Sequence, residues 1–159
     1  MTNTVINGNN NNQSIEKNSQ PSEPGEWTLA QIQTALKRKL PDSLLKELPG
    51  KFKAKYIAWH TAVEILDKYC IGWQWEIKSV TYTTDRIILV GKLSIPTKHG
   101  LVIREATGSE LLKKTSQDYN TGEIKEEEIP YGDPASNAES MAFRRAASKY
   151  GLALYLYKK

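Results

Sequence analysis

Cysteine and histidine are scarce in this chain of 159 residues, which holds one cysteine, Cys70, and two histidines. One cysteine excludes an intramolecular disulfide framework, so we interpret Cys70 as a buried thiol. His60 and Glu64 stand four residues apart, as two metal ligands on one helix face would, but no third ligand follows at a motif spacing. We therefore expect neither a metal nor a cofactor.

Long apolar runs and catalytic motifs are also missing. No run approaches the roughly 20 apolar residues that a membrane-spanning helix needs, and no signal peptide opens the chain. No glycine-rich phosphate loop and no serine–histidine–aspartate pattern occurs. Adjacent carboxylates gather only at residues 126–128, in a polar segment without an apolar pocket around it. We expect a cytoplasmic protein that is not an enzyme.

Residues 1–26 contain few large apolar side chains beyond Val5 and Ile6, and they include a run of asparagines. Such a segment cannot offset its ordering entropy by burial, so the composition predicts a disordered, Asn-rich tail. Residues 27–159 are enough for one domain with a modest core.

The net charge of +4 is spread unevenly along the chain. Residues 1–26 carry −2, residues 27–112 carry +5, residues 113–134 carry −3 and residues 135–159 carry +4. Basic segments favour polyanions such as nucleic acid or an anionic membrane. An ordinary lysine-rich surface is the other interpretation of this charge.

Helical patterns dominate the first half of the domain. Residues 27–39 have apolar side chains at helical spacing, with Thr28 as the cap, and Pro41 ends the pattern. Residues 42–48 favour a further short helical segment. Residues 57–70 form the clearest helix, with an apolar stripe of Trp59, Ala62, Val63, Leu66, Tyr69 and Cys70.

Strand patterns follow. Residues 73–83, 86–95 and 101–112 are alternating or β-branched, with a hairpin tip at 96–100. Residues 113–134 are polar and acidic, which favours a long surface loop with some strand near Ile129. The predicted fold class is α+β: an antiparallel three-stranded β-meander packed with helices.

The C-terminal part begins with a helix at residues 133–151. Asp133 can cap it, Pro134 suits its first position, and Gly151 suits the residue after its end. Residues 152–157 are apolar and β-prone, and we expect them either to pack back on the core or to meet a neighbouring subunit.

Arg144 and Arg145 stand on this helix beside small polar residues. Arg144 shares one helix face with Asn137, Ser140 and Ser148. Planar guanidinium groups suit phosphate, and small serines would let a sugar–phosphate backbone come close. Pairing of the arginines with the acidic segment at 113–134 is an equally good interpretation of these residues.

A second basic segment alternates cations with apolar and aromatic residues. Lys51, Lys53 and Lys55 are interleaved with Phe52, Ala54 and Tyr56. This composition is typical of a groove for a single strand, where charge follows the backbone and rings touch bases or sugars. We interpret the tryptophans at 59, 73 and 75 mainly as structural.

Three segments, at residues 56–60, 72–76 and 133–151, occur in the order and spacing of the Rad-fifty-two-type single-strand-annealing proteins. The chain resembles most the short bacterial and phage members, including DdrA-like proteins. The resemblance implies a β-β-β-α core, assembly of copies into a ring or arc, and single-stranded DNA in a basic groove. It also implies no nucleotide hydrolysis and no metal.

The resemblance carries over to particular residues. Arg144 and Arg145 match a basic pair that grips the inner DNA strand, and Tyr56 matches a tyrosine at the same site. Lys98 matches a lysine on a second, outer DNA path. Lys46 matches a further basic position upstream.

One position departs from the family pattern. Ser148 stands where a basic residue is expected one turn beyond the arginine pair, and Lys149 is the candidate substitute. The chain also stops soon after the core, so we expect no role in recruiting recombinase.

The sequence therefore predicts a protein that binds single-stranded DNA and anneals complementary strands in homologous recombination and double-strand break repair. The expected partners are single-stranded DNA, further copies of the chain, and a single-strand-binding protein or an exonuclease. Passive protection of single-stranded ends is one alternative. A structural oligomerisation domain, with the basic helix paired to residues 126–128 across a subunit interface, is the other.

Overall fold

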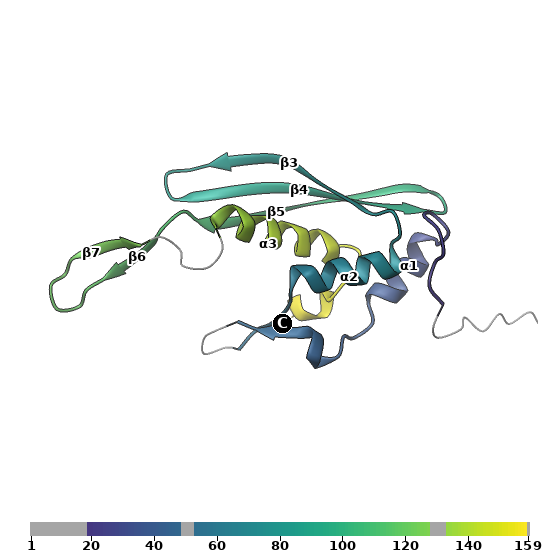
Figure 1. The fold of residues 1–159 in the computed structure, drawn as a ribbon, viewed down its shortest axis with the longest axis horizontal. Coiled ribbons are helices and arrows are strands. Elements are labelled where there is room, and N and C mark those ends of the chain that lie inside the picture. Colours follow the sequence, from purple (N-terminus) through teal and green to yellow (C-terminus); the bar gives the residue numbers. More distant parts are fainter. Residues whose placement is uncertain (1–18, 49–52, 128–132, 159) are drawn as a thin grey trace, which may run out of the picture.

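The computed structural model of the protein describes residues 19–48, 53–127 and 133–158 (Figure 1). Its elements follow in chain order: α1 Leu29–Leu36, 3₁₀ helix η1 Asp42–Leu44, β1 Leu45–Glu47, β2 Lys55–Ile57, α2 Trp59–Tyr69, β3 Gln74–Tyr82, β4 Arg86–Thr97, β5 Gly100–Leu111, β6 Lys114–Gln117, β7 Ile124–Glu127, α3 Pro134–Ser148 and 3₁₀ helix η2 Leu154–Tyr157.

The central sheet is antiparallel, in the order β3–β4–β5, which confirms the predicted meander. A β-bulge interrupts the β3–β4 pairing between Ile77 and Ser79. Thr97 pairs with Gly100, so the β4–β5 turn is shorter than the predicted tip and consists of Lys98 and His99. The predicted α+β class is therefore confirmed.

Helix α3 covers one face of this sheet, over β4 and β5 (Figure 1). The close approach depends on Gly108 in β5: a Cβ atom there would lie 1.9 Å from the Ala138 carbonyl oxygen and 2.7 Å from the Ala142 nitrogen. Small residues on both elements therefore set the distance between helix and sheet. The main core cluster of buried residues lies at the C-terminal end of this contact: Ile32, Leu36, Ile57, Ala62, Leu66, Cys70, Leu93, Ile95, Ala106, Phe143, Ala146, Ala147, Tyr150, Leu152 and Ala153.

Helices α1 and α2 pack on the same core. Thr28 caps α1 as predicted, in a capping box with Gln31. The stripe predicted for α2 is confirmed at Ala62, Leu66 and Cys70, which are buried. The prediction that Trp59 belongs to the buried stripe is wrong, because this side chain is 55% exposed. It is the first residue of α2, and helical side chains lean toward the N-terminus, so its indole projects beyond the core.

The predicted helical segment at 42–48 is only partly correct. It begins as η1, but residues from Leu45 onward form β1, which pairs with β2. The antiparallel partner strand β2 decides the conformation here, and the pattern of residues 42–48 alone does not contain it. Of the predicted extended segment, Lys55 and Tyr56 lie in β2, whereas Lys51 and Phe52 lie outside the described residues.

The loop predicted at 113–134 is a hairpin over much of its length. Strands β6 and β7 pair from Lys114 with Glu127 to Gln117 with Ile124, and the hairpin extends away from the body (Figure 1). Its turn has Gly122 at φ 71°. The residues of both strands are exposed, and all except Ile124 are polar or charged, so the sequence lacks the apolar alternation that would predict strands here. The strand expected near Ile129 lies outside the described residues.

The β conformation predicted for residues 152–157 is wrong. Of the two placements predicted for this segment, packing back on the core is the one that the structure shows. Gly151 at φ 116° and Ala153 at φ 51° turn the chain into η2. Leu152 and Ala153 are buried, so the segment packs back on the core.

Part of the expected tail is also described. Pro21 is buried, and Glu26 accepts a hydrogen bond of 2.9 Å from the Ser22 hydroxyl. Residues 1–18 lie outside the described part of the chain.

Candidate nucleic-acid interface

Helix α3 is fixed at its start by the predicted cap. The Asp133 carboxylate accepts hydrogen bonds from the backbone N–H of Ser136 at 2.8 Å and from the Ser136 hydroxyl at 3.0 Å. These bonds hold the pKa of Asp133 below its usual value, because they stabilise the charged carboxylate. Pro134 occupies the first helical turn, as expected.

Arg144 projects from α3 toward β2. Its Nε donates to the Ser140 carbonyl at 3.0 Å, and one of its terminal nitrogens donates to the Ile57 carbonyl at 3.3 Å. Its guanidinium carbon lies 5.1 Å from the centre of the Tyr56 ring. Two elements therefore hold Arg144 and Tyr56 together, as the resemblance implied.

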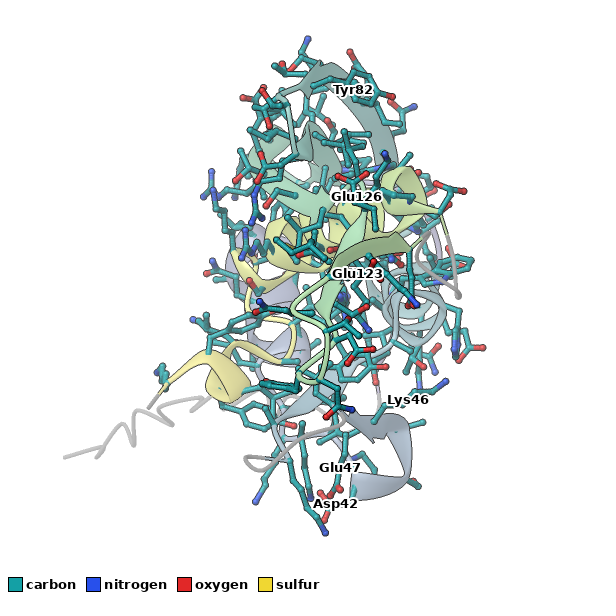
Figure 2. The ribbon with its side chains drawn as sticks, turned by 90° about the vertical axis from the view of Figure 1, so that its left-hand side faces the viewer. Asp42, Lys46, Glu47, Tyr82, Glu123 and Glu126 are labelled. Atoms are coloured by element: carbon teal, nitrogen blue, oxygen red, sulfur yellow. The ribbon has the colours of Figure 1, made fainter. Side chains whose placement is uncertain are left out.

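Strands β1 and β2 form a two-stranded antiparallel sheet, which we call the β1–β2 ribbon, and two of the predicted lysines lie on its opposite faces. Lys46 pairs with Tyr56, so both side chains lie on the same face of the ribbon. Lys55 lies on the other face, opposite Glu47, and its ammonium is 3.0 Å from the Asp42 carboxylate. Figure 2 shows Asp42 and Glu47 together, with Lys46 beside them at the upper edge of the ribbon. Lys46 thus shares the ribbon face of Tyr56, whereas the Lys55 ammonium is paired with Asp42.

Arg145 and Lys149 lean toward the central sheet. A terminal nitrogen of Arg145 donates to the Thr107 carbonyl of β5 at 3.0 Å, and the Lys149 ammonium donates to the Glu105 carbonyl. Both side chains are exposed. Ser148 is buried and its hydroxyl donates to the Arg145 carbonyl at 2.8 Å, so it takes no part in this surface.

A groove with a cavity volume of about 340 Å³ runs between the β1–β2 ribbon and α3. Its lining combines apolar and aromatic side chains with three cations: Leu48, Ala54, Lys55, Tyr56, Ile57, Met141, Arg144, Arg145, Leu156 and Tyr157. Lys53 is exposed beside it at φ 38°. We call this the β2–α3 groove. Lys51 lies outside the described residues.

Lys98 is not part of the β2–α3 groove. It is exposed in the β4–β5 turn, where its backbone N–H donates to the Trp27 carbonyl at 2.8 Å. That turn lies beside α1, and the helical layer separates the sheet from the β1–β2 ribbon (Figure 1).

The sequence leaves open that the acidic segment neutralises Arg144 and Arg145. Within residues 19–48, 53–127 and 133–158, no ion pair joins this segment to either arginine. Glu126 lies 2.6 Å from the Lys113 ammonium instead. Neither Arg144 nor Arg145 has a carboxylate within ion-pair distance among these residues. Glu128 lies outside them.

A second cavity was not predicted. It has a volume of about 570 Å³ and lies between the starts of α2 and β3 and the first half of α3; its lining is Trp59, Val63, Trp73, Trp75, Ser136, Glu139, Ser140 and Phe143. We call it the tryptophan pocket. The sequence signal that could have revealed it is the position of Trp59 at the first turn of a helix, where a side chain leaves the core.

The described residues contain no group of three histidine, cysteine, aspartate or glutamate side chains that could hold a metal ion. His60 and Glu64 are both exposed on α2. Within the same residues, no helix is long and apolar enough to cross a membrane.

No protein-family model matches the chain. It is 32% identical over 144 residues to "DNA repair RAD52-like protein 1, mitochondrial" of Arabidopsis thaliana, a match that covers 89% of this chain and 74% of the relative. It is 31% identical over 134 residues to "DNA repair RAD52-like protein 2, chloroplastic" of the same plant, covering 81% of this chain and 60% of that relative. The chain therefore belongs to the family of RAD52-like DNA repair proteins.

Proposed function

We propose that this chain binds single-stranded DNA in the β2–α3 groove and anneals complementary strands during recombinational repair. The observation that carries the proposal is the Arg144 guanidinium, held against Tyr56 at a groove and without a carboxylate partner among the described residues. A phosphate would supply the missing anion, because guanidinium groups bind phosphate through paired N–H donors. The names of the two relatives, both DNA repair proteins, support this choice of anion.

The groove gives each copy only a few cations. Arg144, Arg145 and Lys55 line it, Lys46 lies opposite Tyr56 on the β1–β2 ribbon, and Lys53 precedes the lining residue Ala54 in the chain. We infer that copies assemble into a ring or arc, which would sum these weak contacts along one strand. A strand held extended loses hairpins that block pairing, so pairing with a complementary strand becomes faster. Neither a nucleotide nor a metal enters this scheme.

Residues 27–159 are the proposed annealing domain, with residues 1–26 as its tail. The kinship with short bacterial and phage DdrA-like members stays a prediction, and so does the cytoplasmic location. A single-strand-binding protein or an exonuclease stays the predicted further partner.

The test compares strand annealing by the wild type, by Arg144→Ala/Arg145→Ala, and by Arg38→Ala/Lys39→Ala. The control pair also removes two adjacent exposed cations, but it follows the end of α1, and neither residue lines the β2–α3 groove. We expect only the first variant to anneal more slowly. A plot of log affinity against log salt concentration should be less steep for this variant by about 1.4. Each phosphate of a single strand that a cation neutralises contributes about 0.7 to the slope, and the variant loses two cations.

The other outcomes are distinct. Equal annealing by the wild type and both variants at moderate salt would contradict the placement of the site. Tight binding without faster annealing by the wild type would favour passive end protection. Absence of DNA binding at low salt would favour a structural role.

A further inference from the structure

The tryptophan pocket has aromatic walls that are locked in place. The Trp73 indole N–H donates to Asp67 at 2.7 Å, and the Trp75 indole N–H donates to Glu139 at 3.0 Å. The Phe143 ring lies 5.6 Å from Trp73 and 5.2 Å from Trp75, measured between ring centres. Rings held in this way present preformed π surfaces, which favour a flat, unsaturated ligand.

Backbone positions support the same walls. A Cβ atom at Gly91 would lie 2.0 Å from the Trp75 ring, so glycine makes room for this indole against the sheet. Trp59 adds a further wall and remains 55% exposed, with its ring perpendicular to that of His60 at 5.9 Å. The wall of the pocket next to the sheet is therefore fixed by packing, and the side formed by Trp59 is exposed to solvent.

Polar groups of α3 complete the pocket. Ser136, Glu139 and Ser140 line it, and the second carboxylate oxygen of Glu139 has no protein donor among the described residues. A carboxylate repels phosphate and accepts hydrogen bonds from amino groups. The charge therefore excludes the backbone of a nucleic acid and suits the edge of a base that carries an amino group.

The pocket adjoins the β2–α3 groove. Ser140 lines the pocket, and its carbonyl accepts the Nε hydrogen bond of Arg144, one helical turn or about 5.4 Å further along α3. A strand whose phosphate rests on Arg144 therefore has the pocket within the reach of one nucleotide.

We propose that the tryptophan pocket takes one unstacked nucleobase for each copy of the chain, from the strand bound at Arg144, and that Glu139 selects bases with an exocyclic amino group. This inference rests on the proposed binding of single-stranded DNA. Aromatic walls supply stacking that every base can use, whereas Glu139 accepts from cytosine or adenine and is repelled by the carbonyl oxygens of thymine. A base held here would fix the register of the strand on the assembly and leave its neighbours to pair.

The experiment measures affinity and its salt dependence for oligocytidine and oligothymidine of equal length, by fluorescence anisotropy. The wild type should prefer oligocytidine about fivefold, the value of one hydrogen bond. Trp59→Ala should weaken both complexes about tenfold, as loss of one stacked base does, with an unchanged salt slope. Glu139→Gln keeps an acceptor for Trp75 and should abolish the preference for cytosine. Arg144→Ala should instead lower the salt slope.

Tyr82→Ala is the matched control, because Tyr82 is a 65% exposed aromatic at the end of β3, outside the tryptophan pocket. Thermal unfolding of each variant reports whether the fold is kept. If the wild type binds both oligonucleotides equally and Trp59→Ala behaves as Tyr82→Ala does, the pocket is not a base site, although the proposed function stands. If an arginine-rich peptide quenches the indole fluorescence and the oligonucleotides do not, the pocket serves a protein partner and the inference fails. If the wild type binds no single-stranded DNA, the proposed function falls as well.

Discussion

The guanidinium carbon of Arg144 lies 5.1 Å from the centre of the Tyr56 ring. The two residues come from α3 and β2, which are 88 positions apart in the numbering, and the Ile57 carbonyl adds a hydrogen bond to the same guanidinium. Since the arginine is held at two points, it is already oriented before any ligand arrives. This lowers the entropic cost of binding an anion.

Replacing Tyr56 tests that orientation. Tyr56→Phe keeps the ring and should bind single-stranded DNA nearly as well as the wild type. Tyr56→Leu loses the cation–π contact, so its binding free energy should weaken by about 0.5–1 kcal/mol. Anisotropy titrations would measure both, and a double-mutant cycle with Arg144→Ala should show coupling between the two residues. Additive effects would mean that Tyr56 contacts DNA independently of Arg144.

Gly108→Ala tests the contact between α3 and the sheet. The new methyl group would lie 1.9 Å from the Ala138 carbonyl oxygen, which is backbone and cannot rotate away. We expect a loss of about 3 kcal/mol in the free energy of unfolding, at the upper end of overpacking costs. Urea denaturation would measure it. Thr107→Ala, at the exposed neighbouring position, should cost less than about 0.5 kcal/mol, as surface substitutions do.

The helices and the meander could be predicted because their signals are local. Thr28 and Asp133 announce helix starts, and the β-branched run of β4 announces a strand. The β1 strand and the β6–β7 hairpin could not. Strand β1 depends on a partner beyond Leu48, and the hairpin has two charged, exposed strands that show no apolar alternation.

Some features of the candidate site could also be predicted from the sequence, and others could not. The sequence predicts Arg144 and Tyr56 together, and the structure places them in contact. The difference between Lys46 and Lys55 was not predictable, because it depends on the register of β1 with β2. The tryptophan pocket escapes prediction because periodicity assigns Trp59 to the core, whereas its place at the start of α2 exposes it.

Tyr150 should make stability depend on pH in the alkaline range. Its buried hydroxyl lies 2.9 Å from the Leu93 carbonyl oxygen and 2.8 Å from that of Val102, and burial raises its pKa to about 12. The ordinary value is 10.0. Below pH 10 the hydroxyl is protonated in both the folded and unfolded states, so its contribution is complete. Between pH 10 and about 12 only the unfolded state loses the proton, so stability falls as pH rises.

Denaturation of the wild type and of Tyr150→Phe across this range would isolate the effect. The variant should be less stable at neutral pH by about 1 kcal/mol, since it loses the hydrogen bond that the single hydroxyl proton shares between these two carbonyls. Its stability should then fall less steeply above pH 10. Parallel curves for the two proteins would contradict the assignment to Tyr150.

Cys70 should be inert in the folded protein. It is 2% exposed, and burial raises the pKa of its thiol to about 12, so very little thiolate exists at neutral pH. A thiol reagent at pH 7 should modify it only as fast as the protein unfolds. Labelling should therefore increase with urea along the unfolding transition, and rapid labelling of the native protein would contradict this expectation.

Lys98 and Arg144 should affect different steps of annealing. Lys98 lies exposed in the β4–β5 turn beside α1, and it does not line the β2–α3 groove. The helices lie between the sheet that carries this turn and the β1–β2 ribbon (Figure 1). A strand bound at Arg144 would not need it, whereas a second strand or duplex following an outer path would. Lys98→Ala should therefore leave the affinity for one strand unchanged and slow the annealing of two. Arg144→Ala should reduce both. Measuring single-strand affinity and annealing rate on the same preparations separates the two roles, with Lys39→Ala as a charge-matched control. If Lys98→Ala lowers single-strand affinity as much as Arg144→Ala does, one strand contacts both sides of the molecule.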